Sequence, residues 1–261
     1  MLEIDPIKTT AALVNFLGQA FKQAGFSRAV IGLSGGLDSG VACTLTVRAL
    51  GAESVYPILL PHGALNSAEV LDAMSVVEWL QIPLSRVTRI DIQPTVNELI
   101  RGLKDPGIDN VRRGNLMARV RMSILFDQAK KRQALVVGTE NKSEHLLGYF
   151  TRFGDAASDL EPLAGLYKTQ VRELGKHLGL PEKILTKIPS AGLWQGQTDE
   201  GELGFRYAEA DQILFLLFEQ KKSPEEVVTA GFSREVVDKV KAQADKNAFK
   251  HHLPIIPSSA N

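Results

Sequence analysis

A glycine-rich turn flanked by hydroxyl and carboxyl groups is the stretch of this sequence best suited to chemistry. It reads Ser34-Gly35-Gly36-Leu37-Asp38-Ser39 and follows an apolar run that ends at Leu33. Two adjacent glycines let the backbone approach a bulky anion, because no Cβ stands in the way. A helix that starts here would point its free N–H groups and the positive end of its dipole at that anion. The stretch therefore predicts a phosphate-binding loop.

The carboxylate of Asp38 adds a second chemical property to this loop. A carboxylate beside a phosphate repels it unless a cation lies between them, and Mg²⁺ bridges carboxylate and phosphate oxygens. We therefore expect Asp38 to be a magnesium ligand. The alternative is an ordinary acidic residue in the first turn of a helix, where the helix dipole favours it.

The loop matches neither of the two common phosphate motifs, since it lacks the Gly-Lys-Ser/Thr end of a P-loop and the GxGxxG spacing. Gly32, Ser34 and Gly36 do fit the Gly-x-Ser-x-Gly pattern around the nucleophile of α/β-hydrolases. That serine normally lies well into a sheet, however, and here the pattern comes close to the N-terminus. A hydrolase would also give Asp38 no role. A hydrolase with Ser34 as its nucleophile remains a remote alternative.

The elements around the loop alternate between two periodicities. Short apolar runs predict strands at residues 29–33, 54–60, 87–92 and 134–138. Helical patterns predict helices at residues 7–25, 39–50, 67–80, 95–103, 110–132, 168–178, 207–220, 223–230 and 233–247, with an irregular tail at 249–254. This alternation predicts βαβ units and a parallel sheet, whose ligands bind beyond the C-terminal strand ends. The loops after Leu33, Leu60 and Gly138 lie at that edge.

Composition and charge exclude several classes of protein and of binding site. Lys plus Arg and Asp plus Glu number 30 each, which argues against nucleic acid or an anionic membrane as the main partner. A single cysteine excludes an internal disulfide and a multi-cysteine zinc site. No apolar run approaches the length of a membrane span, and the first residues do not resemble a signal peptide. We expect a cytoplasmic protein whose 261 residues form a single domain.

Three further polar stretches accompany the loop, at residues 114–122, 138–144 and 149–163. Together with residues 34–39 they resemble the NAD synthetases, a family within the N-type ATP pyrophosphatases, over nearly the whole chain. The resemblance implies an α/β fold of the adenine nucleotide alpha hydrolase-like kind, with a Rossmann-like parallel sheet flanked by helices and a helical C-terminal region. It implies ATP-dependent amidation of deamido-NAD (nicotinic acid adenine dinucleotide) to NAD through an acyl-adenylate, with release of AMP and pyrophosphate.

The resemblance also assigns roles to residues at matching motif positions. For ATP these are Gly32, Leu33, Ser34, Gly35, Gly36, Leu37, Asp38, Ser39, Thr139, Lys168 and Ser190. For deamido-NAD they are Arg119, Arg152, Asp159 and Lys250, and for Mg²⁺ they are Asp38 and Glu144. Asp155, which would position or deprotonate ammonia, and Lys168, a cation on the phosphates, are the expected catalytic residues. Taken singly, most of these side chains could be ordinary surface charges.

The sequence departs from the family pattern at two places. Asp155-Ala156-Ala157-Ser158-Asp159 stands where the family often has Asp-Gly-Gly-Ala-Asp, so we expect a stiffer loop that keeps both acids. Phe249-Lys250 stands where some members have His-Lys, and a stacking or packing contact could replace the imidazole.

The nitrogen donor and the rival functions follow from what the sequence lacks. Glutamine-dependent members carry an N-terminal nitrilase-like glutaminase domain. Because the phosphate loop starts near residue 32, we expect this protein to lack that domain and to use ammonia, free or supplied by a separate partner. The resemblance implies a homodimer with each site near the subunit interface. Other N-type ATP pyrophosphatases that amidate or modify tRNA are the main rivals, and a tRNA enzyme would be expected to show a basic face. A non-catalytic nucleotide-binding module would need no second metal ligand, so Glu144 argues against it.

Overall fold

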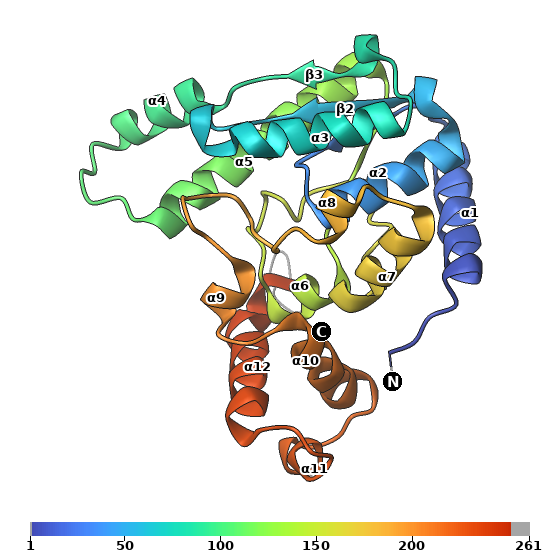
Figure 1. Cartoon of the computed structure of the whole chain (residues 1–261). Coiled ribbons are helices and arrows are strands. Elements are labelled where there is room, and N and C mark those ends of the chain that lie inside the picture. Colours follow the sequence, from blue (N-terminus) through green and yellow to red (C-terminus); the bar gives the residue numbers. More distant parts are fainter. Residues whose placement is uncertain (1, 252–261) are drawn as a thin grey trace, which may run out of the picture.

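A four-stranded parallel sheet forms the centre of the computed structural model, which describes residues 2–251 (Figure 1). The strand order is β3-β2-β1-β4, with every pairing parallel. The strands are β1 (Ala29–Gly32), β2 (Val55–Leu59), β3 (Thr88–Arg89) and β4 (Leu135–Val137). The chain moves outward from β1 to β3 and then returns to place β4 on the other side of β1. The predicted α/β class is confirmed, and the order reverses at β1, where such sheets bind ligands.

Helices cover both faces of the sheet (Figure 1). One face carries α1 (Pro6–Ala24), α2 (Leu37–Leu50), α3 (Ser67–Trp79) and α7 (Lys168–Leu178); the other carries α5 (Asn110–Arg132), against which α4 (Gln93–Leu103) packs. Successive strand residues point to opposite faces. Ile31 therefore joins the core beneath α2, whereas Val30 joins the core beneath α5. Burial on both faces explains why the strands read as continuous apolar runs.

The C-terminal helices form a second core below the sheet, coloured orange and red in Figure 1. They are α9 (Asp199–Leu203), α10 (Tyr207–Leu214), α11 (Pro224–Thr229) and α12 (Arg234–Asn247). This smaller core also takes in Leu147 from α6 (Lys142–Leu147) and Tyr167, the residue before α7. The helical C-terminal region is thus as predicted, and the segments that begin α6 and α7 join it to the sheet.

Several predicted boundaries were wrong. Helix α2 begins at Leu37 rather than residue 39, so Asp38 lies in its first turn. The strand expected at 87–92 shortens to Thr88–Arg89, which follows a 3₁₀ turn (Leu84–Arg86). The helix expected at 207–220 ends in a π-helical turn, Phe215–Glu219.

Short elements inside predicted loops were missed altogether. These are α6, α9, α8 (Glu182–Leu185) and 3₁₀ turns at Ala52–Ser54, Gly63–Asn66 and Ala248–His251. Helices of four to six residues carry too little periodicity to be seen in a sequence. Side-chain caps from Asn141 and Thr198 hold α6 and α9. The last turn covers part of the predicted irregular tail, and the remainder of that tail lies outside the described residues. Across residues 2–251, no helix has the length and apolar character that a membrane crossing requires.

Candidate active site

The predicted phosphate loop connects the end of β1 to the first turn of α2. Leu33 extends the ladder by donating its N–H to the carbonyl of Ile58 at 3.1 Å, and the chain then turns sharply at Gly35, where φ is +74°. The serine hydroxyls close the loop, since Ser34 Oγ and Ser39 Oγ lie 3.0 Å apart and Ser39 Oγ donates to the carbonyl of Gly36. The first helical hydrogen bond comes from Gly40, so the N–H groups before it lie at the positive end of the α2 dipole.

Gly35 is required by this turn, and replacing it with alanine should displace the loop. An added Cβ would lie 2.4 Å from the carbonyl oxygen of Glu69 and 3.0 Å from the amide nitrogen of Ala73, which are backbone atoms of α3 that cannot rotate away. Together with the left-handed φ, this overlap should cost about 2–4 kcal/mol of unfolding free energy and weaken ATP binding. Urea titration and calorimetry with ATP measure both effects. Gly102→Ala, with no atom within 4 Å of the new Cβ, is the matched control. Equal stability of the two variants would contradict the prediction.

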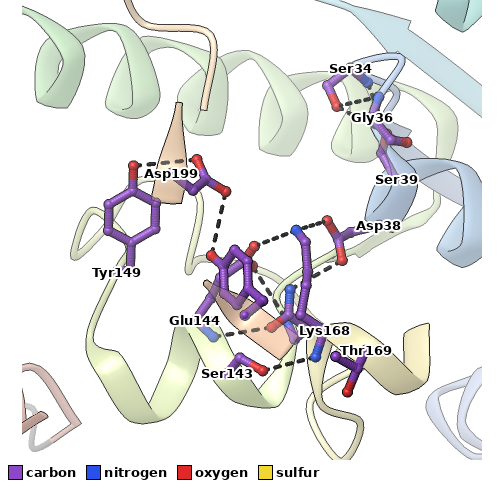
Figure 2. A network of polar contacts seen from close by, with 12 residues as sticks. Ser34, Gly36, Asp38, Ser39, Ser143, Glu144, Tyr149, Lys168, Thr169 and Asp199 are labelled. Atoms are coloured by element: carbon purple, nitrogen blue, oxygen red, sulfur yellow. Dashed lines mark hydrogen bonds and ion pairs between the residues drawn. The ribbon is translucent and has the colours of Figure 1, made fainter. Parts of the chain in front are cut away.

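Three helix N-termini bring Asp38, Glu144 and Lys168 together beside this loop (Figure 2). The Lys168 ammonium lies 2.5 Å from Asp38 Oδ2 and 2.9 Å from Glu144 Oε1. Its side chain is only 6% exposed. Asn141 completes the cluster, because its amide donates to Asp38 Oδ1 at 3.1 Å and its side-chain oxygen caps α6 by accepting the N–H of Glu144. Residues from three distant segments therefore form one buried charged cluster.

Burial and mutual attraction set the charges of this cluster. Burial raises the pKa of Glu144, and the neighbouring Lys168 ammonium counteracts this. Burial alone would lower the pKa of Lys168, but the carboxylates of Asp38 and Glu144 prevail and raise it. The Lys168 ammonium therefore stays protonated, and it offsets part of the cost that burial imposes on the ionised form of Glu144.

The donor set of this cluster fits the predicted magnesium site. One oxygen of Asp38 and one of Glu144 both contact the same cationic atom, Lys168 Nζ. Mg²⁺ in proteins likewise takes one or two carboxylates, together with phosphate oxygens and water. Within residues 2–251, no group of three or more His, Cys, Asp and Glu side chains could hold a metal. A magnesium ion held by Asp38 and Glu144 would therefore need further oxygens from a phosphate.

A pocket of about 500 Å³ opens over the loop and the charged cluster. Most of the predicted site residues line it, namely Gly32, Leu33, Ser34, Gly36, Leu37, Asp38, Ser39, Thr139, Glu144, Asp155, Lys168, Ser190 and Lys250. Gly35 lies behind them against α3. Lys250 donates to the carbonyls of Gly148 and Phe150, at 2.6 and 2.9 Å, and so holds the turn that leads into the Asp155 loop.

Three predicted substrate contacts lie outside this pocket. Arg119 is exposed on α5 and donates to the carbonyl of Arg152 at 3.4 Å. The Arg152 guanidinium lies over the rings of Phe153 and Phe249, at 5.4 and 5.7 Å from their centroids. Asp159 accepts the N–H of Val136 at 2.7 Å, which ties its loop to β4. The structure does not bring these three side chains to the phosphate loop, although it does supply the packing contact expected of Phe249.

The geometry of the site agrees with the comparison of this sequence with known protein families. A family model described as NAD synthase matches residues 9–254. The chain belongs to the NAD synthase family. The predicted family and fold class are thereby confirmed, and the hydrolase alternative is not favoured. The Ser34 hydroxyl instead contacts Ser39 Oγ and accepts from the N–H of Gly36 at 3.3 Å, which are contacts within the loop.

Relatives of NAD synthase type span nearly the whole chain. A curated NH(3)-dependent NAD(+) synthetase from Fusobacterium nucleatum is 45% identical over 244 residues, which covers 94% of this chain and 93% of the relative. A solved structure of NMN synthetase from Francisella tularensis is 36% identical, with a TM-score of 0.85 over 98% of this chain and 99% of that one. An NH3-dependent NAD synthetase from Campylobacter jejuni is 32% identical, with a TM-score of 0.82 over 98% and 100%.

Arg121 is a pocket residue that the sequence interpretation missed. Its guanidinium donates to the carbonyl of Leu60 at 3.1 Å and to Asn66 Oδ1 at 3.2 Å, so it holds the end of β2 at the pocket wall. Helical spacing contains the signal, because Arg121 lies four residues after Met117 on the inner face of α5, whereas Arg119 points outward. The periodicity of this NAD synthase chain could therefore have separated the two arginines.

A second missed group links the segment at 189–204 to the charged cluster. The Tyr149 hydroxyl contacts the carboxylates of Glu202 and, at 3.3 Å, Asp199 (Figure 2). Asp199 is 3% exposed and also accepts from the Tyr207 hydroxyl, whose ring lies under the Lys168 ammonium at 5.3 Å. No local pattern marks the contacts of Tyr149, because its two partners lie 50 and 53 positions away along the chain.

Glu161 follows Leu160, which pairs with Val137 at the end of β4. This carboxyl should make the free energy of unfolding depend on pH. Burial raises the pKa of this carboxyl from 4.5 to about 7. Between these values the folded chain binds more protons than the unfolded chain, so the free energy of unfolding should fall as pH rises through this window. Glu161→Gln keeps the contacts to Ser158 and to the N–H of Glu140 and removes the charge. Urea titrations should find this variant up to about 3 kcal/mol more stable than wild type at pH 8, and equal at pH 4. An unchanged difference between the two pH values would contradict the assignment.

Proposed function

We propose that this chain joins ammonia to the carboxylate of deamido-NAD at the expense of ATP and yields NAD, AMP and pyrophosphate. The observation that carries this proposal is the buried Lys168–Asp38–Glu144 cluster beside a phosphate loop, within one pocket of a member of the NAD synthase family. The arrangement suits departure of a charged phosphate group better than binding alone. A passive nucleotide module has no need of two carboxylates held on one buried lysine ammonium.

The first step activates the carboxylate. A carboxylate does not exchange oxygen for ammonia readily, because oxide is a poor leaving group. One oxygen of the nicotinate carboxylate attacks the α-phosphorus of ATP, a new P–O bond forms, and the bond to the bridging oxygen of pyrophosphate breaks. The N–H groups at the start of α2 and the Lys168 ammonium face the departing phosphates and stabilise their charge. Mg²⁺ bound at Asp38 and Glu144 would neutralise further negative charge on those oxygens.

The second step forms the amide. Ammonia attacks the carbonyl carbon, a C–N bond forms, the C–O bond to AMP breaks, and the nitrogen releases one proton. Asp155 lies on the pocket wall and accepts the N–H of Thr151 at 2.9 Å. Asp155 is exposed at this wall, so its carboxylate can accept that proton. Arg119, Arg152, Asp159 and Lys250 are proposed contacts for deamido-NAD. A homodimer is proposed from the family resemblance, and a cytoplasmic location is proposed from the character of the sequence.

Product analysis with alternative substrates tests the function. Purified protein is incubated with ATP, Mg²⁺, ammonium and deamido-NAD, and AMP, pyrophosphate and NAD are quantified. We expect the three products in equal amounts, and glutamine in place of ammonium should give none. Lys239→Met, which removes an exposed cation on α12, should behave as wild type. Absence of NAD with ammonium would overturn the proposal.

The Francisella relative, named NMN synthetase, justifies a second substrate arm. In that arm nicotinic acid mononucleotide replaces deamido-NAD under the same conditions, and the two kcat/KM values are compared. A higher value for the dinucleotide supports the function proposed above. A higher value for the mononucleotide would keep the amidation chemistry and change the substrate.

A further inference from the structure

A buried carboxylate of the C-terminal region touches the first turns of both helices that supply the charged cluster. Asp211 lies on α10 and is 0% exposed. Its Oδ1 accepts the Ser143 hydroxyl at 2.5 Å, and its Oδ2 accepts the N–H of Thr169 at 2.8 Å. Ser143 Oγ in turn accepts the N–H of Lys168 at 2.8 Å (Figure 2). One carboxylate thus holds the starts of α6 and α7 together.

The two residues that Asp211 holds are neighbours of the two that carry the charges. Ser143 precedes Glu144, and Thr169 follows Lys168. Glu144 and Lys168 come from different helices, and their side chains must meet within hydrogen-bonding distance, at 2.9 Å. Because one carboxylate holds the Ser143 hydroxyl on one side and the N–H of Thr169 on the other, the relative position of the two side chains depends on α10. A neutral side chain could not accept from both groups with two equivalent oxygens.

We propose that Asp211 is a positioning residue for the amidation reaction, acting through Ser143 and the α7 N-terminus to aim Lys168 and Glu144 at the phosphates. It touches neither the pocket nor a substrate group. This inference rests on the function proposed above and extends it, since it places a determinant of rate on the second core of the molecule.

Asp211→Asn is the variant that tests this role. The N–H of Thr169 can only donate, so the asparagine oxygen must face it, and the amide NH₂ must then face Ser143 Oγ. Ser143 already accepts from Lys168, so its own proton loses its partner and the pair shifts. A displacement of a few tenths of an ångström to 1 Å in a positioned group costs up to about 100-fold in rate. We expect kcat to fall about 30- to 100-fold, while the KM for ATP stays within threefold.

Two further variants separate positioning from mere stability. Ile213→Val lies on the same helix, is 0% exposed and packs in the same core without polar contacts, so it should lower the melting temperature and leave kcat unchanged. Ser143→Ala should reproduce the loss in kcat, and adding Asp211→Asn to it should cost little more, because the two act through one contact.

Two results with these variants would overturn the positioning role of Asp211. An Asp211→Asn enzyme that keeps kcat within threefold, or an Ile213→Val enzyme that loses kcat in step with its melting temperature, would overturn the positioning role. Should Asp211→Asn not fold, Ser143→Ala at unchanged kcat overturns it equally. Failure of the proposed function looks different, because wild-type protein itself would then form no amide.

Discussion

Lys168→Met should lower the rate of amidation by about 100- to 1,000-fold, in the range seen when one group that stabilises a developing anion is removed. Methionine keeps nearly the length of the side chain and removes its charge. The loss should appear in kcat more than in the KM for ATP, because the ammonium stabilises charge that builds on the departing pyrophosphate. Steady-state kinetics with ATP, ammonium and deamido-NAD measure the split.

The same variant should bind divalent metal more tightly when no nucleotide is present. In wild type the ammonium lies between the two carboxylates that we propose as magnesium ligands, 2.5 Å from one and 2.9 Å from the other. Removing it leaves two facing carboxylates and frees the space between them, so Mn²⁺ affinity by electron paramagnetic resonance should rise at least tenfold. Lys187→Met removes a cation that also lines the pocket but pairs with Asp72 at 2.7 Å, and it should raise Mn²⁺ affinity less. Equal affinities for all three proteins would contradict the assignment.

Asp38→Asn should have the second-largest effect, with about a 100-fold loss in kcat/KM for ATP. Asparagine keeps the first turn of α2 and can still accept from Asn141, but its amide would face the Lys168 ammonium with no charge to hold it. A first-turn acid contributes at most about 1 kcal/mol to a helix. Asp38 also pairs with the buried Lys168 ammonium, so the unfolding free energy should fall by more than that. The large kinetic loss distinguishes a site residue from a helix acid, which would leave kcat/KM unchanged.

The control for this prediction is another first-turn acid. Glu235→Gln, in α12, removes an acid that pairs with exposed Lys239 and lies outside the pocket. It should leave both activity and Mg²⁺ dependence as in wild type. Wild-type kcat/KM and Mg²⁺ dependence in Asp38→Asn would show that Asp38 is structural.

The sequence alone predicted most of the structural features that are determined by residues close together in the chain. The turn at Gly35 and the apolar run before it predict a strand, a loop and a helix, because backbone freedom and side-chain periodicity are local properties. Arg121 was overlooked in favour of Arg119, although helical spacing places it inward. Asp199 and Asp211 could not be found, since their importance comes from contacts with residues far along the chain that only the folded arrangement creates.

The charged cluster lies at the interface between the core around the sheet and the smaller helical core. Asp38 on α2 and Lys168 on α7 lie on helices that pack in the core around the sheet, whereas Glu144 on α6 and the Asp211 carboxylate belong to the smaller helical core. Proteins open locally in cooperative units whose free energies lie below that of global unfolding. Separation of the smaller unit from the sheet would dismantle the cluster while the strands stayed paired. Catalytic competence therefore follows the opening free energy of the C-terminal helices, and amide exchange in α10 is the quantity that reports it.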